Sequence, residues 1–392
     1  MDFFNILIDG KGARKMTVDA DEMRAIRNIF TTNLGVKKTE RVLVITDLIR
    51  EDEHVTVKER AQRDSLREIA RDTAEAGREF CEVAYLEFPS VGVHGKEPPI
   101  EVWEAAFGKK AVAELSASGV LARVLLKVAT ADDLRRAEEA VIKYAKSPEA
   151  IIALSNCSTS HTRFRDILTR CMGVRYASMP LFERPMLRGA MTADWKAVEE
   201  RTKRLVELVK GAETARVTAR NGTSISFSIV GRDLRPDTGI ITERGAFSNL
   251  PAGEGFLAPV EGTAEGRMVL EWAPDEKLEK PICLEVRKGR VVEVMGEGRF
   301  AEALRKKIEA TPLTGNIAEL GIGTNDRATR PDNILETEKI LGTVHMALGD
   351  NSSFGGKVSV PYHQDFIFFG PTLEVFKNSV KVEVIVEGEP RF

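Results

Sequence analysis

Two of the five histidines of this 392-residue chain lie in its last quarter, where isolated acidic residues accompany them. His363 and Asp365 lie in Pro361-Tyr-His-Gln-Asp-Phe-Ile-Phe-Phe, an aromatic and β-branched run that predicts a strand. Side chains two positions apart share one face of a strand, so this imidazole and this carboxylate can bind one ligand. His345 lies in a second predicted strand, which ends in a turn at Gly349. Imidazole and carboxylate ligands together suit zinc, cobalt, manganese or iron.

Two isolated glutamates extend this candidate metal site. Glu254 is bracketed by glycine and proline in Pro251-Ala-Gly-Glu-Gly-Phe, and Glu319 interrupts the apolar, glycine-punctuated run Ile317-Ala-Glu-Leu-Gly-Ile-Gly. A carboxylate buried in such a run needs a partner, and a cation would satisfy it. Asp350 is a possible additional ligand, although a turn-forming aspartate beside Asn351 explains it equally well. A His-x-Asp pair also serves in many proteins only to fix an imidazole tautomer.

In their order along the chain, these segments resemble the metallo-aminopeptidases of the aminopeptidase T and aminopeptidase S group. Members carry a Pro-x-x-Glu-x-Phe segment, an Ala-Glu-Leu-Gly-like segment, a His-x-Ala-x-Gly segment and a late His-x-Asp. The corresponding segments here begin at Pro251, Ala318, His345 and His363. The resemblance also reaches upstream, through the segments that contain His161 and Pro180.

The resemblance implies an exopeptidase that releases N-terminal amino acids from peptides and acts as a homodimer. Two divalent ions, zinc, cobalt or manganese, would be held by Glu254, Glu319 and His345 on one side and by His363 with Asp365 on the other. Two such ions activate a shared water for attack on the peptide bond. Glu319 or Glu254 would pass a proton to the leaving amine.

The chain departs from the aminopeptidase pattern at two points. The family's tyrosine, seven positions after the histidine of His-x-Ala-x-Gly, is Ser352 here. Tyr362 is a possible replacement, but as the strand neighbour of His363 it should point to the opposite face. The spacing from His345 to His363 is also shorter than in typical aminopeptidases, so the loop between them is trimmed.

Two other functions therefore stand beside the peptidase. The ring-cleaving 2,5-dihydroxypyridine dioxygenases resemble the same scaffold and look like mononuclear iron enzymes with two histidines and one carboxylate. His345, His363 and Asp365 would supply that triad unaided. The third hypothesis is a metal-binding protein with weak or no catalysis, supported by Ser352 alone.

The first half of the chain predicts an α/β arrangement. Apolar runs at 41–47, 82–87, 122–128 and 150–154 predict strands, and charged amphipathic stretches at 58–77, 100–118, 131–146 and 161–172 predict helices. This alternation is typical of a largely parallel sheet with helices on its faces. The turn after the first strand begins at Asp47 and is acidic and without the glycines of a phosphate-binding loop, so we expect no nucleotide cofactor.

The second half predicts short strands with tight turns. A charged helix over 192–210 precedes a hairpin at Asn221-Gly222, and further reversals are predicted at Glu265-Gly266, Lys288-Gly289 and Glu387-Gly388. One helix is predicted over 300–310. We therefore predict an α/β N-terminal domain over residues 1–210, walling the cleft, and a β-rich α+β domain over 211–392 that carries the metal site.

Composition limits the partners. The net charge is −3, and basic residues alternate with acidic ones along the predicted helices, so we expect no nucleic acid partner. No apolar run reaches about 18 residues, and the segment Met1 to Asp9 lacks the basic region of a signal peptide. These features predict a cytoplasmic protein without membrane contact. His54 and His94 are expected at the surface, while His161 and Arg163 belong either to a helix start or to the cleft.

Overall fold

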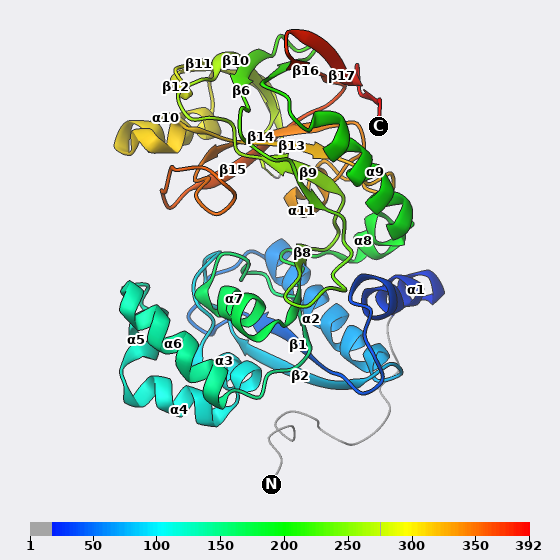
Figure 1. Cartoon of the computed structure of the whole chain (residues 1–392), viewed down its shortest axis with the longest axis vertical. Helices are drawn as coiled ribbons and strands as arrows, with labels where there is room; N and C mark the ends of the chain where they lie inside the picture. Colours follow the sequence, from blue (N-terminus) through cyan, green and yellow to red (C-terminus); the bar gives the residue numbers. More distant parts are fainter. Residues whose placement is uncertain (1–17, 275) are drawn as a thin grey trace. The chain divides into compact units, whose positions relative to one another are not determined.

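The computed structural model describes residues 18–274 and 276–392, and these divide into two compact units. One unit contains the described residues up to Thr192 together with Gly239–Pro251, and the other contains Ala193–Thr238 and Ala252–Phe392. The N-terminal segment that bears on targeting lies outside the described residues. Figure 1 shows the elements of both units along the chain.

This division differs from the predicted boundary at residue 210 for two reasons. Helix α9 (Trp195–Val209) belongs to the second unit because Leu205 and Val209 pack into its core. The short strand β8 (Phe247–Asn249) belongs to the first unit because it pairs in parallel with β4 (Arg175–Ser178). The chain therefore passes from the first unit into the second, returns to the first unit at Gly239–Pro251, and then re-enters the second unit.

Within its described residues, the first unit is built on a five-stranded parallel sheet in the order β2-β1-β3-β4-β8. Its inner strands are buried along almost their whole length, as expected for a sheet covered on both faces, and two of them, at 41–48 and 150–153, are largely apolar. The remaining strands are β1 (Arg41–Leu48), β2 (Glu82–Pro89) and β3 (Ala150–Ala153). The helices are α1 (Ala20–Asn28), η2 (Ile29–Asn33), α2 (Val57–Gly77), α3 (Ile100–Phe107), α4 (Lys109–Ala117), α5 (Val120–Leu125), α6 (Ala131–Tyr144), α7 (Arg163–Ile167), η3 (Leu168–Met172), α8 (Arg184–Arg188) and η4 (Ala190–Thr192).

Most predicted elements of this unit are confirmed, but the strand predicted at 122–128 is wrong. That run is helix α5 followed by a turn, with Val120, Leu121 and Val124 buried and Leu126 72% exposed. Apolar residues at these spacings share one face of a helix rather than one face of a strand. The helix predicted over 100–118 is broken in two at Gly108, whose φ of 84° ends α3.

The described residues of the second unit form two antiparallel sheets. The larger has the order β12-β11-β10-β6-β5-β16-β17-β18 and the smaller the order β15-β14-β13-β9-β7. The strands of the larger sheet are β5 (Thr214–Thr218), β6 (Ser224–Ser228), β10 (Glu265–Trp272), β11 (Lys277–Arg287), β12 (Arg290–Met295), β16 (Thr372–Lys377), β17 (Val380–Val386) and β18 (Glu389–Pro390). Those of the smaller are β7 (Arg235–Asp237), β9 (Glu254–Leu257), β13 (Ile317–Gly323), β14 (Val344–Gly349) and β15 (His363–Phe368). Besides α9, the helices are α10 (Arg299–Ala310), η5 (Pro312–Gly315) and α11 (Ile334–Thr337).

One predicted reversal of this unit is wrong. Glu265-Gly266 opens strand β10, where Gly266 pairs with Ile225 of β6. A Cβ on Gly266 would meet the Ser224 carbonyl oxygen at 2.2 Å, so this glycine permits close approach of two backbones rather than a turn. The reversals predicted at Asn221-Gly222, Lys288-Gly289 and Glu387-Gly388 are confirmed.

The two antiparallel sheets share one hydrophobic core. Val217 and Phe227 of the larger sheet belong to the same buried cluster as Leu320, Met346 and Phe366 of the smaller one. Because strand side chains alternate, the residues next to these three in β13, β14 and β15 point to the other face of the smaller sheet. An N-terminal parallel α/β sheet followed by antiparallel sheets is the predicted fold class. No helix among the described residues has the length and apolar character needed to cross a bilayer.

Candidate metal centre

Three neighbouring strands place the predicted ligands on one face of the smaller sheet. Glu319 of β13 lies opposite Ala347 of β14, which lies opposite Asp365 of β15. His345 and His363 precede Ala347 and Asp365 by two residues, so their side chains point to the same face. Strand register therefore gathers residues that lie up to 46 positions apart in the sequence.

Glycines make room for this cluster. Gly321 lies opposite His345, and a Cβ on Gly321 would be 1.9 Å from the imidazole Nε2. Gly349 lies opposite His363, and a Cβ there would be 2.0 Å from the Tyr362 carbonyl oxygen. The glycine punctuation of the sequence thus has a steric cause, because a larger side chain at either position would meet atoms of the cluster or of the backbone beside it.

The cluster has the spacing of a metal ligand set. Glu319, His363 and Asp365 each offer one ligand atom, and these atoms lie within 4.8 Å of one another. The His363 Nε2 atom is 3.4 Å from Glu319 Oε2 and 3.5 Å from Asp365 Oδ2. Ligand atoms bound at about 2.1 Å in a tetrahedron are about 3.4 Å apart. The separations therefore suit a cation between them without rearrangement of the strands.

The tautomer of His363 also suits a cation. Its Nδ1 lies 2.7 Å from the Asp350 backbone oxygen, which only accepts hydrogen bonds, so Nδ1 carries the proton. The Nε2 lone pair of a neutral imidazole then points at two carboxylates, which repel it. A metal ion bound between the three groups would remove this repulsion. Without a metal, burial would lower the pKa of His363, but Asp365 and Glu319 raise it well above its usual range.

His345 lies on the other side of Glu319. Its Nε2 is 3.6 Å from Glu319 Oε1 and 3.3 Å from Glu254 Oε2. Burial would lower the pKa of His345, but the neighbouring carboxylates of Glu319 and Glu254 raise it to about 9. Burial likewise would raise the pKa of Glu319, and the two imidazoles lower it. The described residues give His345 Nδ1 and Glu254 Oε2 no hydrogen-bond partner.

Two residues of this site were not among the predicted ligands. Lys339 is fully buried, with its Nζ 2.6 Å from Glu254 Oε1 and 2.9 Å from Glu338 Oε2. Burial raises the pKa of Glu338 to about 8, and the Glu338 carboxyl, with the two imidazoles, lowers the pKa of Asp365. In the sequence they are only an adjacent acid and base, in Thr-Glu-Lys-Ile-Leu-Gly just ahead of the His345 strand, a pattern that does not distinguish them from surface residues.

The two additional candidates, Asp350 and Tyr362, have other roles. The Asp350 carboxylate accepts hydrogen bonds from the backbone nitrogens of Ser352 and Val360, as a turn former does, and its backbone oxygen orients His363. The Tyr362 ring lies 4.3 Å from the Lys307 Nζ of helix α10. Ser352 donates its hydroxyl to Asp350 and therefore completes the same turn.

An aromatic flank borders the cluster. The ring of Phe354 stands edge-on to His363 at a centroid distance of 5.8 Å. Phe256 of strand β9 stands edge-on to Phe354, also at 5.8 Å. Both phenylalanines are partly exposed, so they offer apolar surface next to the ligands.

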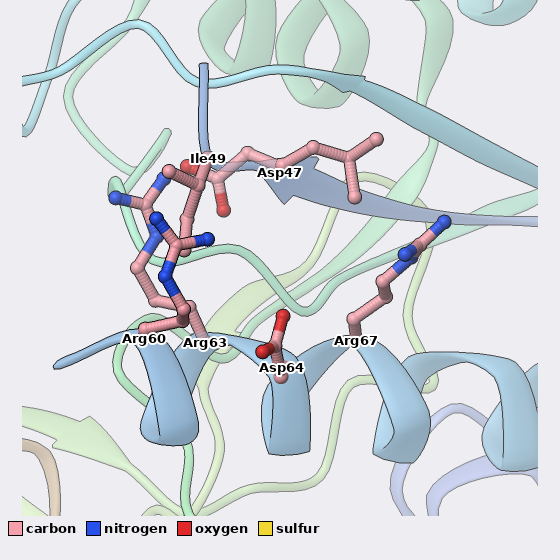
Figure 2. A pocket seen from close by; sticks show the side chains of 7 residues that line it. Asp47, Ile49, Arg60, Arg63, Asp64 and Arg67 are labelled. Atoms are coloured by element: carbon pink, nitrogen blue, oxygen red, sulfur yellow. The ribbon is translucent and has the colours of Figure 1, made fainter. Parts of the chain in front are cut away.

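A separate pocket of about 210 Å³ lies in the first unit, between the end of β1 and the start of α2. Figure 2 shows Asp47 and Ile49 above Arg60, Arg63, Asp64 and Arg67, which come from one helix. Arg63 pairs with Glu53 and Arg67 with Glu87, so most of the positive charge is neutralised. This pocket includes none of the predicted site residues.

The histidines of the first unit do not join the cluster. His94 accepts a hydrogen bond from the Ser158 backbone, and His54 and His161 are exposed. The segment around Arg163 is a helix start, as one of the two interpretations predicted. Thr162 caps α7, and Glu97 accepts hydrogen bonds from the backbone nitrogens of Arg163 and Phe164.

Comparison with known proteins finds one matching family model and two solved structures with a similar fold. The family model described as NicX, 2,5-dihydroxypyridine 5,6-dioxygenase, matches residues 128–383, more than half of the chain. The structure of 2,5-dihydroxypyridine dioxygenase from Pseudomonas putida KT2440 aligns with a TM-score of 0.65 and 18% identity, over 95% of this chain and 98% of that one. Wild-type AmpT from Thermus thermophilus aligns with a TM-score of 0.54 and 14% identity, over 95% of this chain and 99% of that one. At these identities the two structures show a shared fold alone. No curated protein matches the sequence.

Proposed function

This chain belongs to the NicX family of 2,5-dihydroxypyridine 5,6-dioxygenases, and from that premise we propose that it is an iron-dependent dioxygenase that opens the ring of a dihydroxylated aromatic substrate. The observation that carries the proposal is the cluster of Glu319, His363 and Asp365, which lies inside the matched segment and of which Glu319 is buried. Imidazole and carboxylate ligands with open positions are typical of non-haem iron oxygenases. Iron bound there would supply the activation of dioxygen.

The side chains around the cluster would do the remaining work. His363 and Asp365 would hold the ion from strand β15, and His345 and Glu319 would complete the ligand set from β14 and β13. Glu338, whose pKa burial raises to about 8, would exchange a proton with a substrate hydroxyl near neutral pH. Phe354 and Phe256 would support an aromatic ring and exclude water.

A second candidate function is the hydrolytic one, because both glutamates of the aminopeptidase pattern lie beside His345, Glu254 at 3.3 Å and Glu319 at 3.6 Å. In that function they would be ligands of two divalent ions, and peptides would be the substrates. The family match favours the dioxygenase. A homodimer and a cytoplasmic location remain predictions of the sequence for either function.

One experiment separates the candidates. The protein is reconstituted anaerobically with ferrous iron and assayed for oxygen uptake on dihydroxylated pyridines and benzenes. The same sample, with zinc, cobalt or manganese, is assayed for amine release from aminoacyl amides. Ring opening that is lost in H363A and kept in H54A, a surface histidine, supports the dioxygenase. Amine release that depends on His363 in the same way would support the peptidase instead of the dioxygenase. If neither activity is found, the remaining hypothesis is a metal-binding protein without catalysis.

A further inference from the structure

Lys339 is a buried ionisable residue that lies beside the metal cluster but is not one of its predicted ligands. Its ammonium group is fully buried, and it lies 2.6 Å from Glu254 Oε1 and 2.9 Å from Glu338 Oε2. A buried lysine is rare, and its charge is costly unless carboxylates pair with it closely. Here it has two such partners, and one of them, Glu254, is a predicted metal ligand.

The backbone holds this ammonium against Glu254. The backbone nitrogen of Asn325 donates to the Lys339 oxygen at 2.8 Å, and the Leu341 nitrogen donates to the Asn325 oxygen at 3.1 Å. The Asn325 side chain donates to the Ala252 oxygen at 2.9 Å, two residues before Glu254. The segments that carry Lys339 and Glu254 are therefore both hydrogen-bonded to one buried asparagine, Asn325. The backbone thus fixes the position of the Lys339 ammonium next to Glu254.

Glu254 is consequently divided between two partners. Its Oε1 faces the ammonium, and its Oε2 faces the His345 Nε2 at 3.3 Å. Glu254 also stands apart from the three residues whose ligand atoms come within 4.8 Å of one another, which are Glu319, His363 and Asp365. The site thus has two cation positions, one among these three residues and one between Glu254 and Glu338.

We infer that the Lys339 ammonium fills the second of these positions and restricts the centre to one metal ion, held by the proposed ligand set of His345, Glu319, His363 and Asp365. A second divalent ion on Glu254 would lie within a few ångströms of the positively charged Lys339 ammonium, which would repel it. The ion would also have to share the Glu254 and Glu338 carboxylates with that ammonium. The aminopeptidase pattern assigns Glu254 to a metal, and here a residue of the chain takes that place.

This inference deepens the proposed function and rests on the metal site assumed there. One ion suits ring opening by a mononuclear centre, whereas activation of a shared water needs two. Lys339 would then be a residue that determines which of the two reactions this scaffold supports.

The test counts metal ions on the full chain after chelation. Cobalt(II) is titrated by calorimetry and by its visible absorption, with elemental analysis after dialysis. The variants are K339M, the double variant K339M/E254Q, the single variant E254Q, and K203M as a control. Lys203 pairs with Glu199 on the exposed face of α9, so its replacement removes a Lys–Glu pair away from the site.

The inference predicts one cobalt per chain in the wild type, in E254Q and in K203M. It predicts two in K339M, because Glu254 and Glu338 become free, and one again in K339M/E254Q. A wild type that binds two ions, or a K339M variant that binds one with unchanged affinity, would overturn it.

E254Q keeps the test decisive if K339M does not fold. Glu254 serves the ammonium in this inference, so E254Q should retain its ion with affinity within a few-fold of the wild type. Loss of an ion in E254Q would identify Glu254 as a ligand and refute the inference. These counts are independent of catalysis: one ion per chain without oxygen uptake would refute the proposed function and leave the role of Lys339 intact.

Discussion

Gly321 and His345 lie opposite each other on strands β13 and β14, and the imidazole occupies the space that a side chain on Gly321 would fill. The clearance is small, since a Cβ would stand 1.9 Å from Nε2. One strand therefore supplies a predicted metal ligand, and the glycine on the neighbouring strand leaves the space that its imidazole occupies.

Replacing Gly321 by alanine should displace His345 from Glu319. We expect metal affinity to fall about 10–100-fold, as for other changes that misorient a ligand. Cobalt titration measures the loss. Gly315→Ala is the matched control, because a Cβ there meets its nearest atoms at an ordinary 3.4 Å. Equal affinity in the two variants would show that His345 does not bind the metal.

Glu319 is the carboxylate that reaches both imidazoles, at 3.6 Å to His345 and 3.4 Å to His363. Glu319→Gln keeps its shape and removes its charge. We expect turnover to be lost and metal retention to fall at least about tenfold, since a ligand change costs no less than a change in its support. Elemental analysis after dialysis measures retention. Full activity in this variant would remove Glu319 from the ligand set and from proton transfer.

Much of the centre could be predicted from the sequence, because local patterns specify it. The alternation of side chains in a strand places His363 and Asp365 together, and the glycine-rich run marks Glu319. That Tyr362 points away from His363 follows from the same alternation, and its contact with Lys307 agrees. Periodicity could not decide the run at 122–128, since a short apolar segment fits a helix or a strand until packing selects one.

The role of Lys339 could not be predicted in the same way. Lysine is normally a surface residue, and nothing in Glu338-Lys339 indicates that both carboxylate partners lie beside the metal ligands. The contact with Glu254 joins residues 85 positions apart and depends on the loop held by Asn325. Long-range charge pairing of this kind appears only with the tertiary structure.

The stability of the metal-free protein should fall as pH rises. The pKa of His345 is about 9 in the folded chain, against about 6.5 in an unfolded one. A group whose pKa is higher in the folded chain stabilises that chain fully at pH values below its unfolded pKa. This stabilisation is lost as the pH rises through its folded pKa. The raised pKa of Glu338 acts in the same direction.

We therefore expect the free energy of unfolding with chelator present to drop by on the order of 3 kcal/mol between pH 6 and pH 9.5. Urea unfolding across that range measures it. The variant His345→Gln should flatten the profile, while His54→Gln, at an exposed position, should not. A flat wild-type profile would contradict the protonated state of His345.

Metal binding should release protons in the neutral range. Both His345 and His363 have raised pKa values without a metal, and an imidazole binds a metal only after its proton leaves. The affinity for cobalt should accordingly increase from pH 6 to pH 8. Calorimetry in two buffers of different ionisation enthalpy counts the released protons. Equal heats in both buffers would mean that no imidazole enters the ligand set.

Phe354 should contribute to substrate binding rather than to metal binding. It stands edge-on to His363 and to Phe256 at 5.8 Å each, so an aromatic substrate at the metal would meet its ring. An aromatic pair is worth about 0.5–1.5 kcal/mol, which corresponds to a rise in KM of about 2–12-fold in Phe354→Ala. Phe369→Ala is the control, since that phenylalanine pairs with Trp272 at the end of strand β10 in the larger sheet. Because Phe354 offers no ligand atom, its variant should retain the metal. If metal is lost along with substrate affinity, Phe354 supports the loop that orients His363, and the aromatic flank is not a substrate surface.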